Sequence, residues 1–377
     1  MVSMAIDRRT FLLGSGAALL AAASRPARAA TPPIEETFFS GRAEGANRFQ
    51  VAAFDGAGNM LLECALPARC HAVAVRPDGT ECVAVARRPG TFAVVIDVAN
   101  GTVRQQMTST RGRTFAGHAI FSADGRWLFL TEDDSELGEG FVSVRDVQDA
   151  YRIARSFRTH GVGPHELLWA ADGRTIAVAN GGILINPDSG RAPLNIDTMQ
   201  PSLALIDASD GSLQHAVHLS ADLHQLSIRH LAVISGGRLA FGMQYQGPLV
   251  DDVPLAGIVD PDGSVRLLGM PDEFQSRTQQ YIGSVTADAS GRWLAASAPR
   301  GGIVLVWEAE TGAFVGGIDI ADGCGLSRTS SDGELLLTSG AGVVERAICE
   351  APLRSRRIES AALADGQWDN HVAFRQA

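Results

Sequence analysis

The apolar residues of this chain fall into short runs of strand length, separated by polar turns that close on glycine. Three such runs with their turns occupy residues 71–79, 118–125 and 165–173, and each turn ends in Asp-Gly. An Asp-Gly pair between two apolar runs favours a β-hairpin, because these residues tolerate the positive φ angles of the turn. A second apolar run follows each turn, a third usually ends on an acidic residue, and a fourth completes the unit. The pattern predicts a repeated unit of four antiparallel strands.

The predicted first strands of these units recur at an interval that indicates the architecture. They begin near residues 71, 118, 165, 230, 283, 325 and 371, at spacings of 47, 47, 65, 53, 42 and 46 residues. A four-stranded unit that recurs every 40–50 residues or so is typical of a β-propeller blade. We therefore predict an all-β chain that forms a seven-bladed β-propeller.

The seventh unit is split between the two ends of the chain. Residues 370–374 are predicted to form a first strand with no further strand after it. Residues 38–43, 49–55 and 59–66 are predicted to form a second, third and fourth strand with no first strand before them. Joining the two ends completes the last blade and leaves no open sheet edge. Two β-sandwiches in tandem, the alternative fold, would not explain a split unit.

Residues 1–29 have the pattern of a twin-arginine export signal. An Arg-Arg pair precedes an apolar run, residues 11–23, which is shorter than the roughly 20 residues that a membrane-spanning helix needs. The small residues of an Ala-Arg-Ala segment then place a cleavage site after Ala29. We expect a bacterial periplasmic protein whose mature part, residues 30–377, is the propeller and has no membrane span. The alternative is a hydrophobic N-terminal helix.

The charged residues narrow the possible partners and chemistry. The chain has 32 cationic residues, all of them arginine, and 42 acidic residues, which gives a formal charge of −10. Residues 1–29 hold four arginines and one aspartate, so their removal leaves a mature charge of −13. Without lysine there is neither a Schiff-base lysine nor the lysine of a nucleotide-binding P-loop. Because an acidic chain repels phosphate backbones, we expect no binding to nucleic acid. We also expect no nucleotide cofactor and a monomeric protein.

The five cysteines carry no recognisable metal or haem motif. None belongs to a C-x-x-C pair, which argues against a zinc ribbon or a thioredoxin-like site, and no C-x-x-C-H segment is present to attach haem. An odd number of cysteines in an oxidising compartment permits at most two disulfides. We expect most of the cysteines to be small buried apolar side chains.

The loops predict on which face of the ring the function lies. In a propeller the first strand of each blade starts on the same face as the loops that join second to third strands. Three of these loops are long and span residues 132–140, 180–200 and 244–254, whereas those of three other units have four or five residues. Long loops on a rigid scaffold are usually functional, so we expect the site on this face.

Histidines gather at the start of the predicted first strands, on the same face. Five of the nine histidines of the chain stand there, where neutral imidazoles could ligate a transition metal such as iron, copper or zinc. Two carboxylates lie beside them and could complete the site. The candidate metal ligands are His71, His118, His165, His230, His371, Glu132 and Glu166. The alternative role of each histidine is to hydrogen-bond the backbone of a nearby loop.

The spacing of these histidines from their turns leaves open how many of them converge. His71 and His165 lie eight residues before the glycine of the turn, whereas His118 and His230 lie seven residues before it. A shift of one residue turns a strand side chain to the opposite face. We expect three or four of the five side chains to converge, and the other four histidines of the chain to be structural or exposed.

Several motifs of the chain resemble those of a known family. They include Thr-Glu-Asp-Asp at residues 131–134, and segments at residues 117–122, 161–166, 178–183, 194–203, 226–231 and 299–302. With these motifs the mature chain resembles the periplasmic family of the domain of unknown function 1513, which is similar to WD-repeat and YVTN-type propellers and is exported by the twin-arginine route. The Asp at position 133 departs from the Asn expected there. The resemblance supplies no activity, but such proteins are often encoded near imelysin-type iron proteins, which implies a role and a partner in iron handling.

Three functions remain open from the sequence. The first, which we favour, is a non-enzymatic metal-binding or accessory protein in iron acquisition. The second is a protein-interaction platform without metal, with Arg229, Tyr245, Arg300 and Trp368 near the recognition face. The third is a metal-dependent hydrolase or lactonase, in which a metal or a histidine would activate water. The chain has no Gly-x-Ser-x-Gly nucleophile motif, so an enzyme is the least favoured of the three.

Overall fold

The computed structural model of the chain describes residues 36–376, apart from residues 46, 89, 187–191 and 365. The predicted export signal, residues 1–29, lies outside the described residues. The described residues form one compact unit that is built mainly of β-strands. Its two short α-helices are α2 (Asp272–Arg277) and α3 (Ala361–Ala364). Within this part of the chain, no helix is long and apolar enough to cross a membrane.

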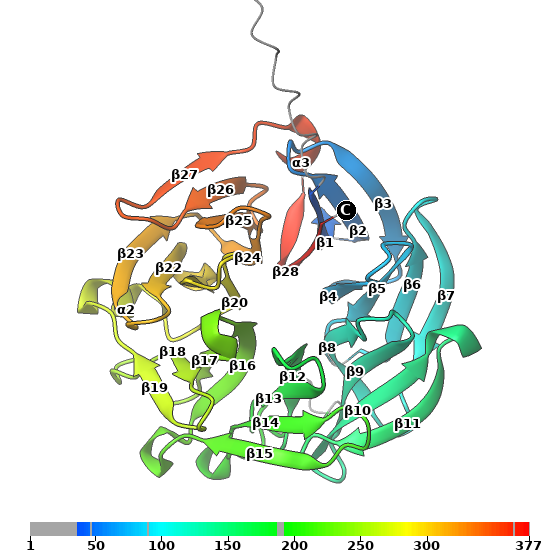
Figure 1. The fold of residues 1–377 in the computed structure, drawn as a ribbon, viewed down its shortest axis with the longest axis horizontal. Helices are drawn as coiled ribbons and strands as arrows, with labels where there is room; N and C mark the ends of the chain where they lie inside the picture. The colour runs from blue at the N-terminus through cyan, green and yellow to red at the C-terminus, as the bar shows by residue number, and fades with distance from the viewer. Residues whose placement is uncertain (1–35, 46, 89, 187–191, 365, 377) are drawn as a thin grey trace, which may run out of the picture. The chain divides into compact units, whose positions relative to one another are not determined.

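Five antiparallel sheets of four strands surround a common centre, and each has its first strand innermost (Figure 1). The first three sheets comprise β4 (Cys70–Val75), β5 (Glu81–Ala86), β6 (Phe92–Asp97) and β7 (Thr102–Thr108); β8 (Thr114–Phe121), β9 (Trp127–Asp134), β10 (Glu139–Asp146) and β11 (Arg152–Arg158); and β12 (Pro164–Trp169), β13 (Thr175–Asn180), β14 (Ser202–Asp207) and β15 (Leu213–His218). The next two comprise β16 (Leu226–Val233), β17 (Leu239–Tyr245), β18 (Ala256–Val259) and β19 (Val265–Leu268); and β20 (Ser284–Ala287), β21 (Trp293–Ala298), β22 (Ile303–Glu308) and β23 (Phe314–Asp319).

An eight-stranded sheet contains both ends of the described chain. One half comprises β24 (Gly323–Arg328), β25 (Glu334–Ser339), β26 (Val344–Ile348) and β27 (Arg354–Arg357); the other comprises β28 (Gln367–Gln376), β1 (Glu36–Glu44), β2 (Arg48–Asp55) and β3 (Met60–Leu66). The antiparallel pairing of β28 with β1 confirms the prediction that the C-terminal strand and the N-terminal strands share a sheet. The two halves are joined by one parallel pair, Leu326 with His371.

The innermost strands form a closed cycle of neighbours. β28 contacts β4, β4 contacts β8, and the contacts continue through β12, β16, β20 and β24 back to β28. All-β sheets arranged radially in this way have the architecture of a β-propeller. The strands nearest the centre therefore carry the residues that meet there.

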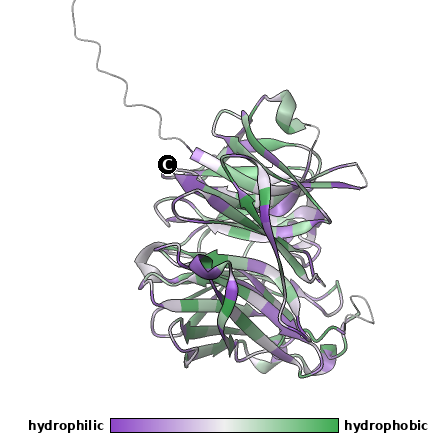
Figure 2. Ribbon diagram, turned by 90° about the vertical axis from the view of Figure 1, so that its right-hand side faces the viewer, coloured by the Kyte–Doolittle hydropathy of each residue, from purple (hydrophilic) through white to green (hydrophobic). Residues whose placement is uncertain are grey.

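The core lies between neighbouring sheets rather than within one central layer. Strands in the middle of a sheet are buried on both faces, as in β5 and β13, where every residue is buried. The outermost strands have one exposed face, and β7 is mostly exposed. Figure 2 shows the result as hydrophobic segments inside the strands and hydrophilic segments toward their ends and loops. Burial of apolar side chains on both faces of each sheet is the main stabilising contribution.

The predicted long loops are present in two sheets, and the prediction for the third is wrong. β13 and β14 are separated by residues 181–201, and β17 and β18 by residues 246–255. The loop expected at residues 132–140 is mostly strand, since Asp134 of β9 pairs with Glu139 of β10 and leaves four residues, 135–138, between them. Backbone pairing extends these strands into a polar segment, which the alternation of apolar residues could not reveal.

The five cysteines are all buried and unpaired: Cys64, Cys70, Cys82, Cys324 and Cys349. Burial raises the pKa of the Cys82 and Cys324 thiols to about 12. A thiol that stays protonated at neutral pH is neither nucleophilic nor a ready metal ligand. The cysteines therefore pack as small apolar side chains, as predicted.

A buried carboxylate joins the two halves of the eight-stranded sheet. Glu36 of β1 accepts hydrogen bonds from the backbone N–H and hydroxyl of Ser330 and from the Arg346 guanidinium of β26. Burial alone would raise the pKa of Glu36, but these hydrogen bonds outweigh it and hold the pKa below the ordinary value of 4.5. Its contribution to stability is thus fully present above the unfolded pKa and is lost as the pH falls through the folded pKa.

We expect Glu36→Gln to unfold at a lower urea concentration than the wild type at pH 7, because the variant lacks the ionised partner of Arg346. The difference in unfolding free energy should shrink as the pH falls below 4.5, the ordinary pKa, because the wild-type carboxyl then becomes neutral as well. Urea unfolding of the wild type and the variant, from pH 7 to below 4.5, measures this difference in unfolding free energy. A difference that grows on acidification would contradict this role of Glu36.

Candidate functional site

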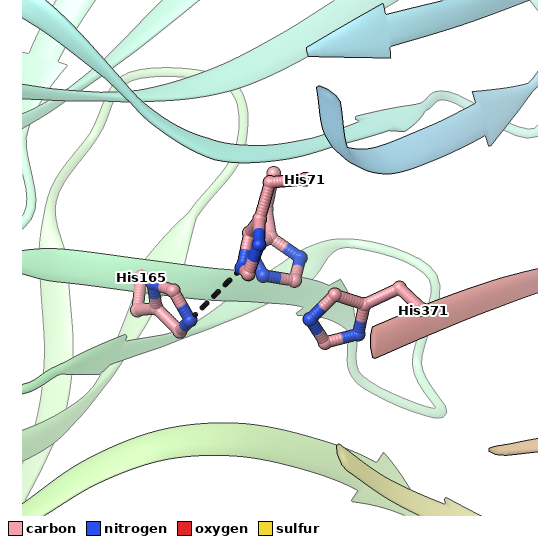
Figure 3. A group of neighbouring side chains, drawn as sticks. His71, His165 and His371 are labelled. Carbon is pink, nitrogen blue, oxygen red and sulfur yellow. Dashed lines mark hydrogen bonds between the residues drawn. The ribbon is translucent and has the colours of Figure 1, made fainter. Parts of the chain in front are cut away.

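Five histidines from five innermost strands meet at the centre of the ring. The ring centroids of neighbouring histidines lie between 4.5 Å apart, for His118 and His371, and 6.2 Å apart, for His118 and His230. The side chains come from β4, β8, β12, β16 and β28 and are those of His71, His118, His165, His230 and His371. Figure 3 shows the rings of His71, His165 and His371 turned toward one another. All five predicted histidines converge, more than the three or four that the spacing indicated.

Irregular pairing at each histidine explains why the spacing was misleading. The register of β4 with β5 shifts between Cys70 and Ala72, on either side of His71, and that of β8 with β9 shifts between Phe115 and Ala119. Similar shifts occur at His165, at His230 and opposite His371. A β-bulge re-aims the side chain beside it, so one extra residue no longer turns it to the opposite face. The bulges thus allow histidines that lie seven residues before their turn glycine and histidines that lie eight residues before it to reach the same place at the centre of the ring.

Four of these histidines are close enough to share one metal ion. One ligand atom from each of His71, His118, His165 and His371 lies within 4.8 Å of the others. The Nε2 atoms of His71 and His165 are 3.3 Å apart. Four imidazole nitrogens bound tetrahedrally at the usual zinc distance of about 2.0–2.1 Å are about 3.3–3.4 Å apart. This pair therefore has the separation of two ligands of a tetrahedral ion as well as that of a hydrogen bond.

The histidines are held in the neutral form that binds metals. Burial, with repulsion from neighbouring histidines and arginines, lowers the pKa of all five, and that of His230 and His371 to about 3. At neutral pH each ring keeps a nitrogen lone pair. Nε2 of His118, Nε2 of His371 and Nδ1 of His165 are buried without a hydrogen-bond partner among the described residues. Since such atoms usually find a partner, they indicate that the site accommodates an additional group.

Glu166 belongs to a second group of possible ligands, with His118 and His230. One carboxylate oxygen lies 3.3 Å from Nδ1 of His230 and accepts the backbone N–H of Leu231, and the other lies 3.9 Å from Nδ1 of His118. Burial raises the pKa of Glu166 to about 7. The bulge in β12 lets Glu166 and its neighbour His165 both reach the histidine cluster. A cation bound in this second group would favour the ionised carboxylate.

Comparison with known proteins agrees with the fold and assigns no activity. Residues 64–374 match a family described as a protein of unknown function (DUF1513). The chain belongs to the DUF1513 family. No curated protein is a significant match. Among solved structures, Kuenenia stuttgartiensis hydrazine synthase is similar at a TM-score of 0.59 and 15% identity, over 84% of this chain and 93% of that chain. At this identity the similarity supports the propeller-like fold alone.

The seven candidate ligands all lie within the DUF1513 match, but Glu132 stands apart from the others. Its side chain is fully buried, where it accepts the backbone N–H of Thr110 and lies 3.6 Å from Arg113 and 3.8 Å from Arg145. Neither group of possible ligands includes it. The adjacency of Glu132 to the inner strand suggested a ligand, whereas its position on β9 directs it between Arg113, which precedes β8, and Arg145 of β10.

Two arginines that were not among the predicted site residues border the cluster. Arg87 and Arg88 follow β5 and line a cavity of about 440 Å³ over the histidines, together with Arg229 and Arg300. Their place at the end of a second strand, directly before a loop on the functional face, was the signal that could have identified them. Trp368, expected near the recognition face, is instead fully buried. It packs with apolar residues of β1, β2, β25 and β26, between the two halves of the eight-stranded sheet, where burial stabilises its large ring.

We expect Gly117→Ala to displace His71 and lower metal affinity. Gly117 has a φ of +106°, and a Cβ atom built there would lie 2.5 Å from Cδ2 of His71. Moving one ligand should weaken binding at least about 10-fold, by analogy with the loss of a group that orients a ligand. Competition with a chromogenic chelator measures the affinity. Gly173→Ala is the matched control, since Gly173 also has a positive φ (+65°) but its Cβ would meet nothing within 4 Å. Equal metal affinity of the two variants would contradict the prediction.

Proposed function

We propose that the protein binds one transition metal ion at the centre of the ring through His71, His118, His165 and His371. The observation that carries the proposal is the proximity of four neutral imidazoles, with a ligand atom of each inside 4.8 Å. His230 and Glu166 lie beside this set as a further neutral and a further anionic ligand. Imidazole with carboxylate suits iron and also accepts zinc or copper.

We propose a binding or accessory protein rather than an enzyme. Catalytic metal sites usually have three protein ligands and an open position for water or substrate, whereas sites with four protein ligands are closed. A four-histidine set favours retention of the ion over water activation. A metal-dependent hydrolase or lactonase is therefore less well supported.

We propose that the ring has seven blades. The two halves of the eight-stranded sheet each have four strands in the order of the other sheets, and they share one parallel pair instead of a ladder. If each half counts as one blade, the eight-stranded sheet supplies two blades, and with the five separate sheets the ring has seven. The last blade then combines β28 from the C-terminal end with β1, β2 and β3.

We propose that the mature protein works in the bacterial periplasm, after export by the twin-arginine route. The Arg-Arg pair, the short apolar run and the Ala-Arg-Ala segment of residues 1–29 support this. This route carries folded proteins, which suits a site assembled from strands at both ends of the chain. The role we propose there is in iron acquisition, with an imelysin-type iron protein as partner, as the family resemblance implies.

Metal analysis tests the central proposal. The chain is purified without a polyhistidine tag, loaded separately with iron, copper and zinc, dialysed, and assayed by elemental mass spectrometry. We expect one ion per chain for at least one of the three metals. A stoichiometry near zero after all three loadings would overturn the proposal, and loss of all iron from the iron-loaded protein on dialysis would contradict the role in iron acquisition.

A further inference from the structure

The cavity over the histidines has a charge opposite to that of the chain. It is lined by four arginines, Arg87, Arg88, Arg229 and Arg300, and by no acidic residue of the described chain, although the formal charge of the whole protein is −10. The buried Asp133 lies 3.7 Å from Arg88 and also interacts electrostatically with Arg229, so it partly offsets the charge of both arginines. A cationic concavity in an acidic protein attracts anions.

The arginines approach the cavity from three sheets. Arg87 follows β5, Arg229 lies on β16 beside His230, and Arg300 lies in a short 3-10 helix, η6 (Pro299–Gly301), that follows β21. Each guanidinium presents a planar set of donors that fits one carboxylate or phosphate group. Because they come from separate sheets, they suit a ligand with more than one anionic group.

Arg300 is held in place before any ligand arrives. Its guanidinium lies 4.2 Å from the centre of the Tyr281 ring and donates a hydrogen bond to the Gln279 carbonyl, while the Gln279 amide donates to the Arg300 carbonyl. A guanidinium ordered in this way loses less conformational entropy when it binds an anion. The cavity therefore has a partly pre-organised cationic wall.

The remaining wall indicates an organic ligand rather than an inorganic ion. Ile183, Ile185 and Pro193 of the long loop after β13 line one side, and the side chains of Tyr245 and Tyr281 contribute aromatic surface. A volume of about 440 Å³ is that of a small-molecule site and far exceeds what one phosphate fills. His71, His165 and His230 form part of the lining and add neutral hydrogen-bonding groups.

We propose that this cavity binds a small organic anion that carries two or more carboxylate groups. The arginines bind the carboxylates, and the apolar and aromatic wall contacts the carbon skeleton. The inference goes beyond the proposed metal site and does not require it, since the arginines that would bind the anion are not among the possible metal ligands, although His71 and His165 border both sites. A polycarboxylate held there would lie directly over the histidines and could restrict access to them.

Isothermal titration calorimetry with citrate, acetate and inorganic phosphate tests the proposal. We expect citrate to bind the wild type more tightly than acetate or phosphate, and the double variant Arg87→Gln with Arg300→Gln to bind citrate at least about 100-fold more weakly, because it lacks two charged donors. Arg354→Gln with Arg356→Gln on the exposed strand β27 removes the same charge elsewhere and should bind like the wild type. The single variant Arg300→Gln, at an exposed position, should show a smaller loss of about 10-fold.

Three results would overturn the proposal: no citrate binding by the wild type, equal binding of phosphate or acetate, or unchanged citrate binding by both Arg300→Gln variants. Metal content measured on the same samples distinguishes the loss of the metal site from the loss of the anion site. The arginine variants should keep their metal, and His118→Ala, whose side chain is outside the cavity lining, should keep citrate binding. Citrate binding by a wild type that retains no metal would remove the proposed metal function and leave this inference intact.

Discussion

His118→Ala is expected to abolish stoichiometric metal binding. His118 belongs to both groups of possible ligands, so its removal breaks the four-histidine set and the set that contains Glu166. Loss of a group that merely orients a ligand costs about 10–100-fold in affinity, so loss of a ligand should cost more than about 100-fold. Competition titration with a chelator and elemental analysis after dialysis measure the change.

The same variant should also lose stabilisation by metal. An ion that binds only the folded chain, present at 100 times its dissociation constant, stabilises the fold by about 2.7 kcal/mol. The wild type should therefore resist urea better when the metal is present, and His118→Ala should unfold at the same urea concentration with or without it. The stability of the two metal-free proteins is compared first. Any difference there reports damage to the fold, so a difference that appears only when metal is added reports loss of the site.

His215→Ala is the matched control, because His215 is exposed on β15 and lies outside the cluster. It should bind metal like the wild type and gain the same stability from it. If His118→Ala kept the wild-type affinity for metal, His118 would not be a ligand, and the proposed four-histidine site would be wrong.

The strands could be predicted from the sequence because each one depends on local signals. Asp-Gly turns and alternating apolar residues indicate hairpins without any knowledge of distant contacts. The pairing of β28 with β1 is a long-range contact, yet the repeat predicted it. The first strand at residues 370–374 has no second, third and fourth strand after it, and the N-terminal strands are the three that complete the unit. The histidines stood out because they recur at one element of that repeat.

The site could be predicted in its residue types but not in its geometry. The β-bulges beside His71, His118 and His165 determine where these side chains point, and no sequence pattern predicted the bulges. Glu132 lay in the right segment, but its contacts with Arg113 and Arg145 depend on how β9 pairs with β8 and β10, which the turn signals do not specify. The arginine-lined cavity could not be predicted from the sequence either, because its cationic residues come from three separate sheets.

Trp368→Ala should cause the largest loss of stability. Trp368 of β28 is fully buried, with its ring centroid 5.1 Å from that of Phe54 on β2 and the guanidinium carbon of Arg42 5.4 Å from its ring. Replacing a buried tryptophan with alanine typically costs about 3–5 kcal/mol, because apolar burial is lost and a cavity remains. Since β28 is the innermost strand of its half of the sheet, the loss should weaken the closure between the two ends of the chain. Urea unfolding without metal, in the presence of a chelator, measures it.

His371→Ala, three residues further along β28, separates closure of the ring from assembly of the site. It removes a proposed ligand but leaves the Trp368 contacts in place, so we expect loss of metal binding with a much smaller loss of stability. Trp368→Phe should lie between the wild type and Trp368→Ala in stability, because a smaller ring fills part of the cavity. If Trp368→Ala unfolded at the wild-type urea concentration, β28 would not be what holds the two ends of the chain together. Because β28 carries both residues, strand pairing that joins the ends of the chain also brings the last histidine to the centre.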